Sequence, residues 1–113
     1  YSSGSDKRTY CYISDAIIGY LRALLLGKAS EAYNIGNKYP EISVTNLAKK
    51  IIKNTKSNVE IEFVKNKDKE YLTHNPSRRC PNLNKSEKEL SFFPRISLSD
   101  GIKKTFKFYN ELI

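Results

Sequence analysis

Apolar residues recur every three or four positions in three segments of the chain, which is the spacing of one helix face. The spacing predicts helices over residues 14–26, 43–54 and 97–112. Ser14, Ser43 and Ser97 stand at the three starts, where a hydroxyl oxygen can accept a hydrogen bond from a helical N–H group. Asp15 falls in the first turn of the first helix, where the helix dipole favours a carboxylate. Gly27 follows that helix and predicts its end.

Three shorter segments have compositions typical of strands. Thr9–Ile13 is rich in β-branched and aromatic residues, Ala32–Ile35 is mostly apolar, and Val59–Phe63 alternates apolar residues with glutamates. Strands and helices that follow one another along the chain are typical of a mixed architecture. The chain is therefore predicted to be a helix-rich α/β unit with about three main helices and three or four short strands.

The stretch between the second and the last predicted helix carries weaker signals. Residues 65–81 are polar and basic without periodicity, which predicts a long surface loop. A short helix is predicted over 85–90, with Asn84 as its cap, and the aromatic run Phe92-Phe93-Pro94 ends it. At 113 residues the chain has the length of one small domain, residues 1–113, and is too short for a two-domain enzyme.

The chain lacks methionine, even at position 1, so we expect it to be processed or cut from a longer protein. Residues 1–7 contain no basic and apolar segments of a secretory signal. The longest apolar stretch, residues 16–26, is shorter than the ~20 residues that span a bilayer. We therefore expect a cytoplasmic protein that does not enter a membrane. In that setting Cys11 and Cys80 are expected as free thiols, and His74 has no companions for a metal site.

The net charge of +8 raises the possibility of a nucleic-acid partner. Most of the basic residues are lysines, and they are scattered through every segment rather than gathered on one. This pattern favours solvated lysines and no nucleic-acid partner. The alternative, a stand-alone basic module that binds nucleic acid or another polyanion, stays open from the residues alone.

The residues for dinucleotide chemistry are absent from this sequence. A dinucleotide loop needs closely spaced glycines, and the five glycines here are dispersed. A short-chain dehydrogenase needs a tyrosine with a lysine four positions later, and none of the eight tyrosines has one. We therefore predict that this chain alone binds no NAD and turns over no substrate, and that it contains no catalytic residue.

The remaining candidate residues suit an anion-binding site. Arg78 and Arg79 precede Pro81, and each guanidinium can bond two phosphate oxygens at once. A solvated basic loop explains the same pair equally well. Arg8 could pair with a surface carboxylate, and Asn34, close to a glycine, could simply supply turn chemistry.

Five motifs in one order resemble the carboxy-terminal third of extended short-chain dehydrogenases, the family of NAD-dependent nucleotide-sugar epimerases, dehydratases and decarboxylases. The motifs are Arg8-Thr-Tyr-Cys-Tyr-Ile-Ser-Asp15-Ala16, Tyr33-Asn34-Ile35-Gly36, Arg78-Arg79-Cys80-Pro81-Asn82, Ser91-Phe92-Phe93-Pro94 and Ser97-Leu98-Ser99-Asp100-Gly101-Ile102. The sequence departs from the family where Asn82 replaces an aspartate and where serine and phenylalanine replace Gly-Trp in the aromatic plug.

The resemblance implies a lobe of a Rossmann-type enzyme that binds the nucleoside diphosphate of a nucleotide sugar. In the family, the first arginine and one of the later pair clamp the pyrophosphate, which implies Arg8 with Arg78 or Arg79. The family asparagine equivalent to Asn34 lies close by, and Asn82 takes the position of an aspartate near the ribose. The parent enzyme would use NAD to oxidise the sugar at C4 before epimerising, dehydrating or decarboxylating it.

The resemblance also implies a missing partner, the amino-terminal cofactor domain. In the family, the strand equivalent to Ala32–Ile35 belongs to that domain's sheet. Without the domain, the helix with Ile17, Ile18 and Leu21 would expose apolar residues that the parent buries. We therefore expect the chain to associate with itself, as a homo-oligomer or an aggregate.

Overall fold

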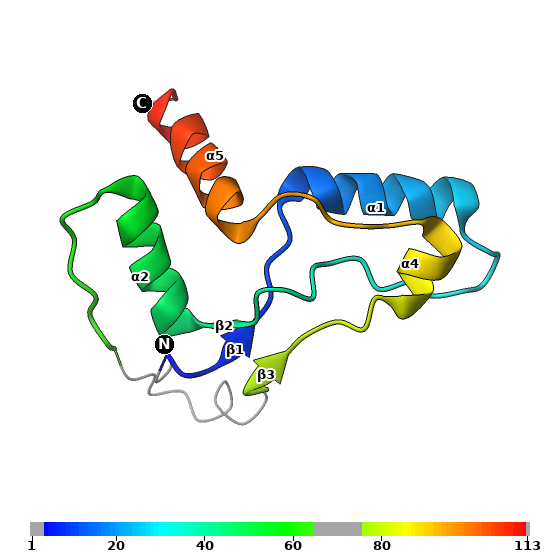
Figure 1. The fold of residues 1–113 in the computed structure, drawn as a ribbon, viewed down its shortest axis with the longest axis horizontal. Helices are drawn as coiled ribbons and strands as arrows, with labels where there is room; N and C mark the ends of the chain where they lie inside the picture. The colour runs from blue at the N-terminus through cyan, green and yellow to red at the C-terminus, as the bar shows by residue number, and fades with distance from the viewer. Residues whose placement is uncertain (1–3, 65–75, 113) are drawn as a thin grey trace.

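The computed structural model describes residues 4–64 and 76–112. Within them, four helices and a three-stranded sheet form a flat unit of 46 × 38 × 23 Å. Helices α2 (Val44–Thr55) and α5 (Leu98–Asn110) lie at one side of the molecule in Figure 1, and helices α1 (Ile13–Leu26) and α4 (Asn84–Leu90) at the other. Extended segments connect the two sides. The predicted mixed, helix-rich α/β class is confirmed.

The three main helices lie where the hydrophobic spacing predicts them. The Oγ of Ser43 accepts a hydrogen bond from Asn46 N (3.2 Å) and begins α2. The Oγ of Ser97 accepts one from Asp100 N (3.1 Å) and donates to that residue's carboxylate (2.6 Å), so α5 begins with a side-chain N-cap. The predicted Ser14 cap is wrong, because α1 begins one residue before Ser14 and has no side-chain cap.

The predicted short helix is confirmed as α4, but its cap is not Asn84. The helix starts at Asn84 itself, and the backbone N–H of Asn84 donates to the Oδ1 of Asn82 (2.9 Å). The side chain two positions earlier therefore supplies the acceptor that the sequence assigned to Asn84. Because an asparagine readily bonds backbone two residues ahead, this is ordinary Asx-turn geometry.

The sheet is built from three two-residue strands in the order β2-β1-β3. Strand β1 (Lys7–Arg8) runs antiparallel to β2 (Ile42–Ser43) and parallel to β3 (Arg78–Arg79). Strand β3 lies inside the segment that the sequence predicted as a loop, and the rest of that prediction, residues 65–75, lies outside the described residues.

The three predicted strands are wrong: Thr9–Ile13, Ala32–Ile35 and Val59–Phe63 form no strand. Strand propensity needs a partner backbone to act on, and β1 finds its partners two residues before the predicted start. The carbonyls of Ala32 and Asn34 instead accept hydrogen bonds from side chains of α4.

The fully buried apolar residues of the described chain gather around α4. Leu83, Leu90 and Phe92 are almost inaccessible to solvent. Gly19 of α1 lies against this cluster, because a Cβ on it would come within 2.9 Å of the Phe92 ring and still closer to Ile35. Helix α1 thus approaches α4 through its smallest residue.

A polar anchor holds the start of α1. The buried carboxylate of Asp15 accepts hydrogen bonds from the backbone N–H groups of Arg95 (3.0 Å) and Ile96 (2.8 Å). At the other end of the helix, Arg22 donates to the carbonyl of Leu90 (2.9 Å). These bonds tie α1 to the segment that leads from α4 to α5.

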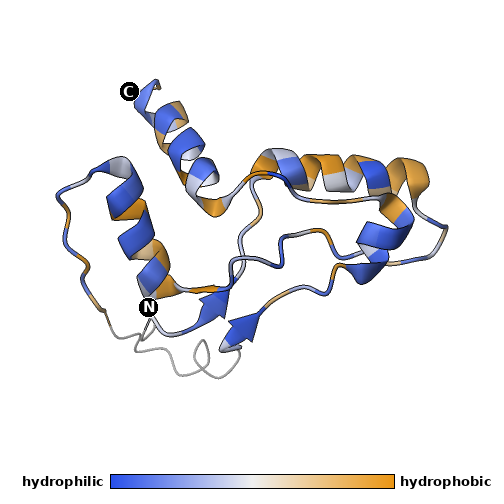
Figure 2. Cartoon of the chain, viewed as in Figure 1, coloured by the Kyte–Doolittle hydropathy of each residue, from blue (hydrophilic) through white to orange (hydrophobic). Residues whose placement is uncertain are grey.

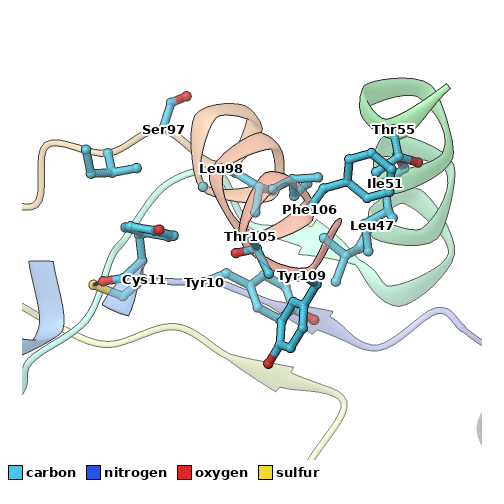
Figure 3. Close-up of a pocket in the computed structure, with 14 residues that line it drawn as sticks. Tyr10, Cys11, Leu47, Ile51, Thr55, Ser97, Leu98, Thr105, Phe106 and Tyr109 are labelled. Carbon is cyan, nitrogen blue, oxygen red and sulfur yellow. Dashed lines mark hydrogen bonds between the residues drawn. The ribbon is translucent and has the colours of Figure 1, made fainter. Parts of the chain in front are cut away.

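On the other side of the molecule, α2 and α5 pack against each other around an apolar cavity of about 410 Å³. Figure 3 shows side chains of both helices pointing into it, together with residues of the segment that follows β1; among them are Leu47, Ile51, Phe106, Tyr109 and Tyr10. Part of each apolar face predicted for these two helices therefore lines one cavity. Five lysines of the two helices are exposed: Lys49, Lys53, Lys103, Lys104 and Lys107.

The outward side of α1 is apolar as well (Figure 2). Leu24 and Leu25 are 78% and 77% exposed, and Ile17, Ile18 and Leu21 are about half exposed. Despite this apolar character, no helix within the described residues has the length and hydropathy needed to cross a membrane.

Candidate anion-binding groove

The short sheet and two loops form an open groove of about 610 Å³. Arg8 and Arg79 lie side by side, as register partners of the parallel strands β1 and β3. Ile35, Gly36 and Pro81 from the two loops form another part of its wall, with Asn37 and both cysteines also in the lining. The structure therefore brings three of the five predicted site residues, Arg8, Arg78 and Arg79, into one place.

Arg8 is held at the start of this groove by backbone carbonyls. Its Nη1 donates to the carbonyl of Lys7 (2.8 Å) and its Nη2 to that of Pro76 (2.7 Å), and Asp6 lies 4.0 Å away. Because the side chain is only 16% exposed, these contacts fix the guanidinium in one orientation.

Arg78 is engaged with a carboxylate. Its Nε and Nη2 each donate to one oxygen of Glu41, both at 2.8 Å, in the two-bond fork that guanidinium groups form with carboxylates. The hydrogen bonds and the charge of Arg78, together with the charge of Lys7, lower the pKa of Glu41. Arg78 is thus neutralised by its own chain.

Arg79 differs from both. It is exposed, and within residues 4–64 and 76–112 no hydrogen bond or ion pair engages its side chain. Since side chains alternate between the faces of a strand, Arg79 lies on the same face as Arg8, and Arg78 on the other. Of the three groove arginines, the one whose guanidinium has no acceptor among the described residues therefore lies beside Arg8.

The two predicted asparagines lie next to the groove and are bonded to each other. The amide of Asn34 donates to the carbonyl of Asn82 (3.0 Å), while the Oδ1 of Asn82 accepts from the N–H of Asn84. Their neighbours Ile35, Gly36 and Pro81 are groove residues. In this arrangement the asparagines join the two loops that form one wall.

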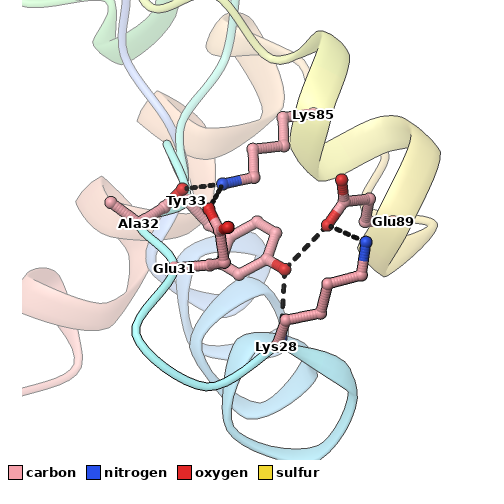
Figure 4. Close-up of polar contacts among 6 residues, drawn as sticks. All are labelled: Lys28, Glu31, Ala32, Tyr33, Lys85 and Glu89. Carbon is pink, nitrogen blue, oxygen red and sulfur yellow. Dashed lines mark hydrogen bonds and ion pairs between the residues drawn. The ribbon is translucent and has the colours of Figure 1, made fainter.

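A network of polar contacts fastens one of these loops to α4 (Figure 4). The Tyr33 hydroxyl donates to Glu89 (2.9 Å) and accepts from the backbone N–H of Lys28 (3.1 Å). Lys85 pairs with Glu31 (2.5 Å), and its ammonium also lies 4.5 Å from the centre of the Tyr33 ring. The bond from Tyr33 is the main cause that lowers the pKa of Glu89, and the bond to Glu31 raises that of Lys85.

Sequence reasoning missed Glu41 and the anchor between Ser86 and Asn34. Glu41 carries no local signal, because its partner is 37 positions away. Ser86 is fully buried and its hydroxyl donates to the carbonyl of Asn34. Ser86 carries no local signal either, because its acceptor lies 52 positions away.

Two other kinds of chemistry bear on the groove. In the described part of the chain, no group of three His, Cys, Asp or Glu side chains is placed to hold a metal ion. Of the two free thiols in the lining, that of Cys11 has a raised pKa, first because of burial and second because of the nearby Asp15 charge. A raised pKa keeps this thiol protonated and weakly nucleophilic at neutral pH.

No family model matches the chain. Its sequence is 36% identical to human dTDP-D-glucose 4,6-dehydratase over 98% of the chain and 32% of that enzyme. It is 31% identical to UDP-glucuronic acid decarboxylase 6 of Arabidopsis thaliana over 88% of the chain and 27% of that protein. The chain thus spans about a third of the length of the curated relatives it matches.

The fold agrees with the sequence. The chain superposes with a TM-score of 0.84 on Bacillus cereus UDP-glucuronic acid 4-epimerase, solved with UDP-glucuronic acid and NAD, at 25% identity and over 100% of this chain and 35% of that one. A dTDP-glucose 4,6-dehydratase from Bacillus anthracis has the same fold with a TM-score of 0.81. These comparisons confirm the predicted relationship: the chain corresponds to a carboxy-terminal part of the extended short-chain dehydrogenases that act, with NAD, as nucleotide-sugar dehydratases, epimerases and decarboxylases.

Proposed function

We propose that this chain is the substrate-binding side of an NAD-dependent nucleotide-sugar epimerase, dehydratase or decarboxylase, and that Arg8 and Arg79 bind the diphosphate of the substrate. The observation that carries the proposal is the register of β1 and β3, which sets these two arginines side by side in one groove. Two adjacent phosphates carry enough charge to engage two guanidinium groups, and such charge-assisted bonds are the strong ones.

The choice between the two loop arginines follows from their partners. Arg78 already satisfies its fork with Glu41, whereas Arg79 is exposed and faces the same side as Arg8. A phosphate could therefore accept hydrogen bonds from the Arg79 guanidinium without first breaking an ion pair. The paired Asn34 and Asn82 support the wall on which the nucleoside would lie.

We further propose that the outward side of α1 is where an amino-terminal cofactor domain docks. The relatives are about three times as long as this chain, and the Bacillus cereus epimerase binds NAD. A helix that is apolar on its outward side as well is typical of one buried between two layers. The hydride chemistry and the NAD site would belong to that domain, and the chain alone would bind no NAD.

The alternative function, a stand-alone module for nucleic acid or another polyanion, gains no support from the relatives and structures named above. It predicts that binding depends on the sum of the lysines rather than on one pair of arginines. The two functions can therefore be separated by single substitutions that remove the same charge at different places.

The test is a titration of the chain with UDP and with dTDP at low salt, followed by NMR. Arg79→Ala should weaken binding about tenfold or more, because at least one charge-assisted hydrogen bond is lost. Lys107→Ala, which removes one positive charge from α5 far along the chain, is the matched control and should change the affinity less than about twofold. Equal losses in the two variants would favour the polyanion module and contradict the proposed clamp.

A further inference from the structure

The fork between Arg78 and Glu41 joins the two outer strands of the sheet. Arg78 belongs to β3, and Glu41 immediately precedes β2, while β1 lies between them. Since neighbouring strands lie about 4.8 Å apart, the two side chains together bridge roughly twice that distance. The ion pair between Arg78 and Glu41 therefore spans β1, and we refer to this pair as the clip.

The register shows which face of the sheet carries the clip. Lys7 of β1 is the partner of Ser43 on one side and of Arg78 on the other, so these three residues share a face. Glu41 lies two positions before Ser43, so its side chain is on the same face of the sheet as that of Ser43. Arg8 and Arg79 occupy the opposite face, and the clip can act there only through the backbone of β3.

That backbone has few other bonds to hold it. Each strand is two residues long. Beyond the strand pairing itself, bonds from Lys7 N to the carbonyl of Ser77 (2.8 Å) and from Arg8 Nη2 to that of Pro76 (2.7 Å) join β1 to the residues just before β3. Strand pairs this short are marginal on their own. The bidentate contact between Arg78 and Glu41 adds a side-chain link that spans all three strands.

We propose that Glu41 is a positioning residue for substrate binding: by gripping Arg78 across β1 it holds β3 in the register that sets Arg79 beside Arg8, and Arg78 itself makes no phosphate contact. This inference rests on the proposed function, because it assigns Arg79 and Arg8 to the diphosphate. It adds a residue that touches no substrate and removes Arg78 from the clamp.

A charge swap separates a positioning role from direct contact. We would compare the intact chain with E41R, with R78E and with the double variant E41R/R78E, which restores an ion pair of reversed polarity. Affinity for UDP and dTDP would be measured at low salt, together with the side-chain Nε signal of Arg79. Glu111→Arg on α5 is the control, since it makes the same charge change as E41R away from the sheet.

Each single substitution in the clip should weaken diphosphate binding about tenfold, the loss expected when Arg79 no longer reaches the ligand. The double variant should recover to within about threefold of the intact chain, because pairing and net charge are both restored. The Arg79 Nε signal should move in both single variants and return in the double variant. Glu111→Arg should leave affinity and signal unchanged.

Two results would overturn the inference. If the double variant binds as weakly as R78E, Arg78 contacts the phosphates directly. If all three variants bind as well as the intact chain, the clip positions nothing. An intact chain that binds neither nucleotide would contradict the proposed function instead. In that case the nuclear Overhauser contacts between the backbones of Lys7 and Arg78 still decide whether the clip sets the register: they should vanish in E41R and return in the double variant.

Discussion

Helix α1 and the pair α2–α5 use their apolar residues in opposite ways. Helices α2 and α5 turn apolar side chains toward each other and toward one cavity (Figure 3). Helix α1 meets its own chain through Gly19, Asp15 and Arg22, and turns its leucines and isoleucines outward.

The difference teaches which contacts this chain completes by itself. Helices α2 and α5 cover part of their apolar stripes against each other, although Ile51, Phe106 and Tyr109 stay partly exposed. Helix α1 has two different sides. Its inner side contacts the chain through Gly19 and the hydrogen-bonded Asp15 and Arg22. Its outer side exposes a large apolar area. Such a surface attracts a partner. The predictions below test each side in turn.

The largest effect is expected on assembly. The exposed side of α1 should drive the chain to associate with itself when no cofactor domain covers it. Replacing Leu21 and Leu25, which lie one turn apart on that side, by glutamate should give a monomer. The measurement is sedimentation velocity over a range of concentrations. Phe108→Glu, an equally apolar and exposed position on α5, should leave the association unchanged; an intact chain that stays monomeric throughout would contradict the role given to α1.

The next effect concerns the inner side of α1. Phe92 is fully buried against Gly19, and its truncation to alanine should cost about 3–5 kcal/mol of unfolding free energy. Hydrogen exchange should show protection lost in α1 and α4 and retained in α5. The neighbouring Phe93 is 60% exposed, so Phe93→Ala is the matched control and should cost much less. Equal costs would mean that α1 is not held by this cluster.

A smaller loss is expected at the polar anchor. Asp15→Asn removes the charge that two backbone N–H groups share, at about 1.5–3 kcal/mol for a charged acceptor of this kind. Asp100, in the first turn of α5, is exposed, and Asp100→Asn should cost less than about 1 kcal/mol. Urea denaturation of both variants gives the comparison. The anchor would be disproved if the two aspartates proved equivalent.

The helices could be predicted from the sequence because their signals are local. A stripe of apolar residues and a capping serine, as at Ser43 and Ser97, lie within one or two turns of each other. The strands could not, because their existence depends on partners far along the chain. Lys7 finds Ser43 and Arg78 as partners, while the better strand-former Tyr10 finds none in the described residues.

The candidate site, too, could be predicted in part from local motifs and in part could not. Motif order was enough to predict that Arg8 and the pair Arg78–Arg79 meet, and the structure places them in one groove. It was not enough to choose between the two loop arginines, because that choice depends on Glu41, whose position beside Arg78 only the sheet creates. Whether these residues bind a diphosphate stays a prediction.

The smallest effect separates the starts of α1 and α5. Ser97 accepts a hydrogen bond from Asp100 N and donates to its carboxylate, so Ser97→Ala should cost about 1 kcal/mol. Ser14 occupies the corresponding place in the sequence of α1, but the helix begins before it and the serine is exposed, so Ser14→Ala should be neutral or slightly stabilising. Thermal and urea denaturation of the two variants under one buffer condition measure the difference. A cost of about 1 kcal/mol at Ser14 would show that α1 starts with a serine cap in solution, and the contrast between the two helices would then begin only after their first turn.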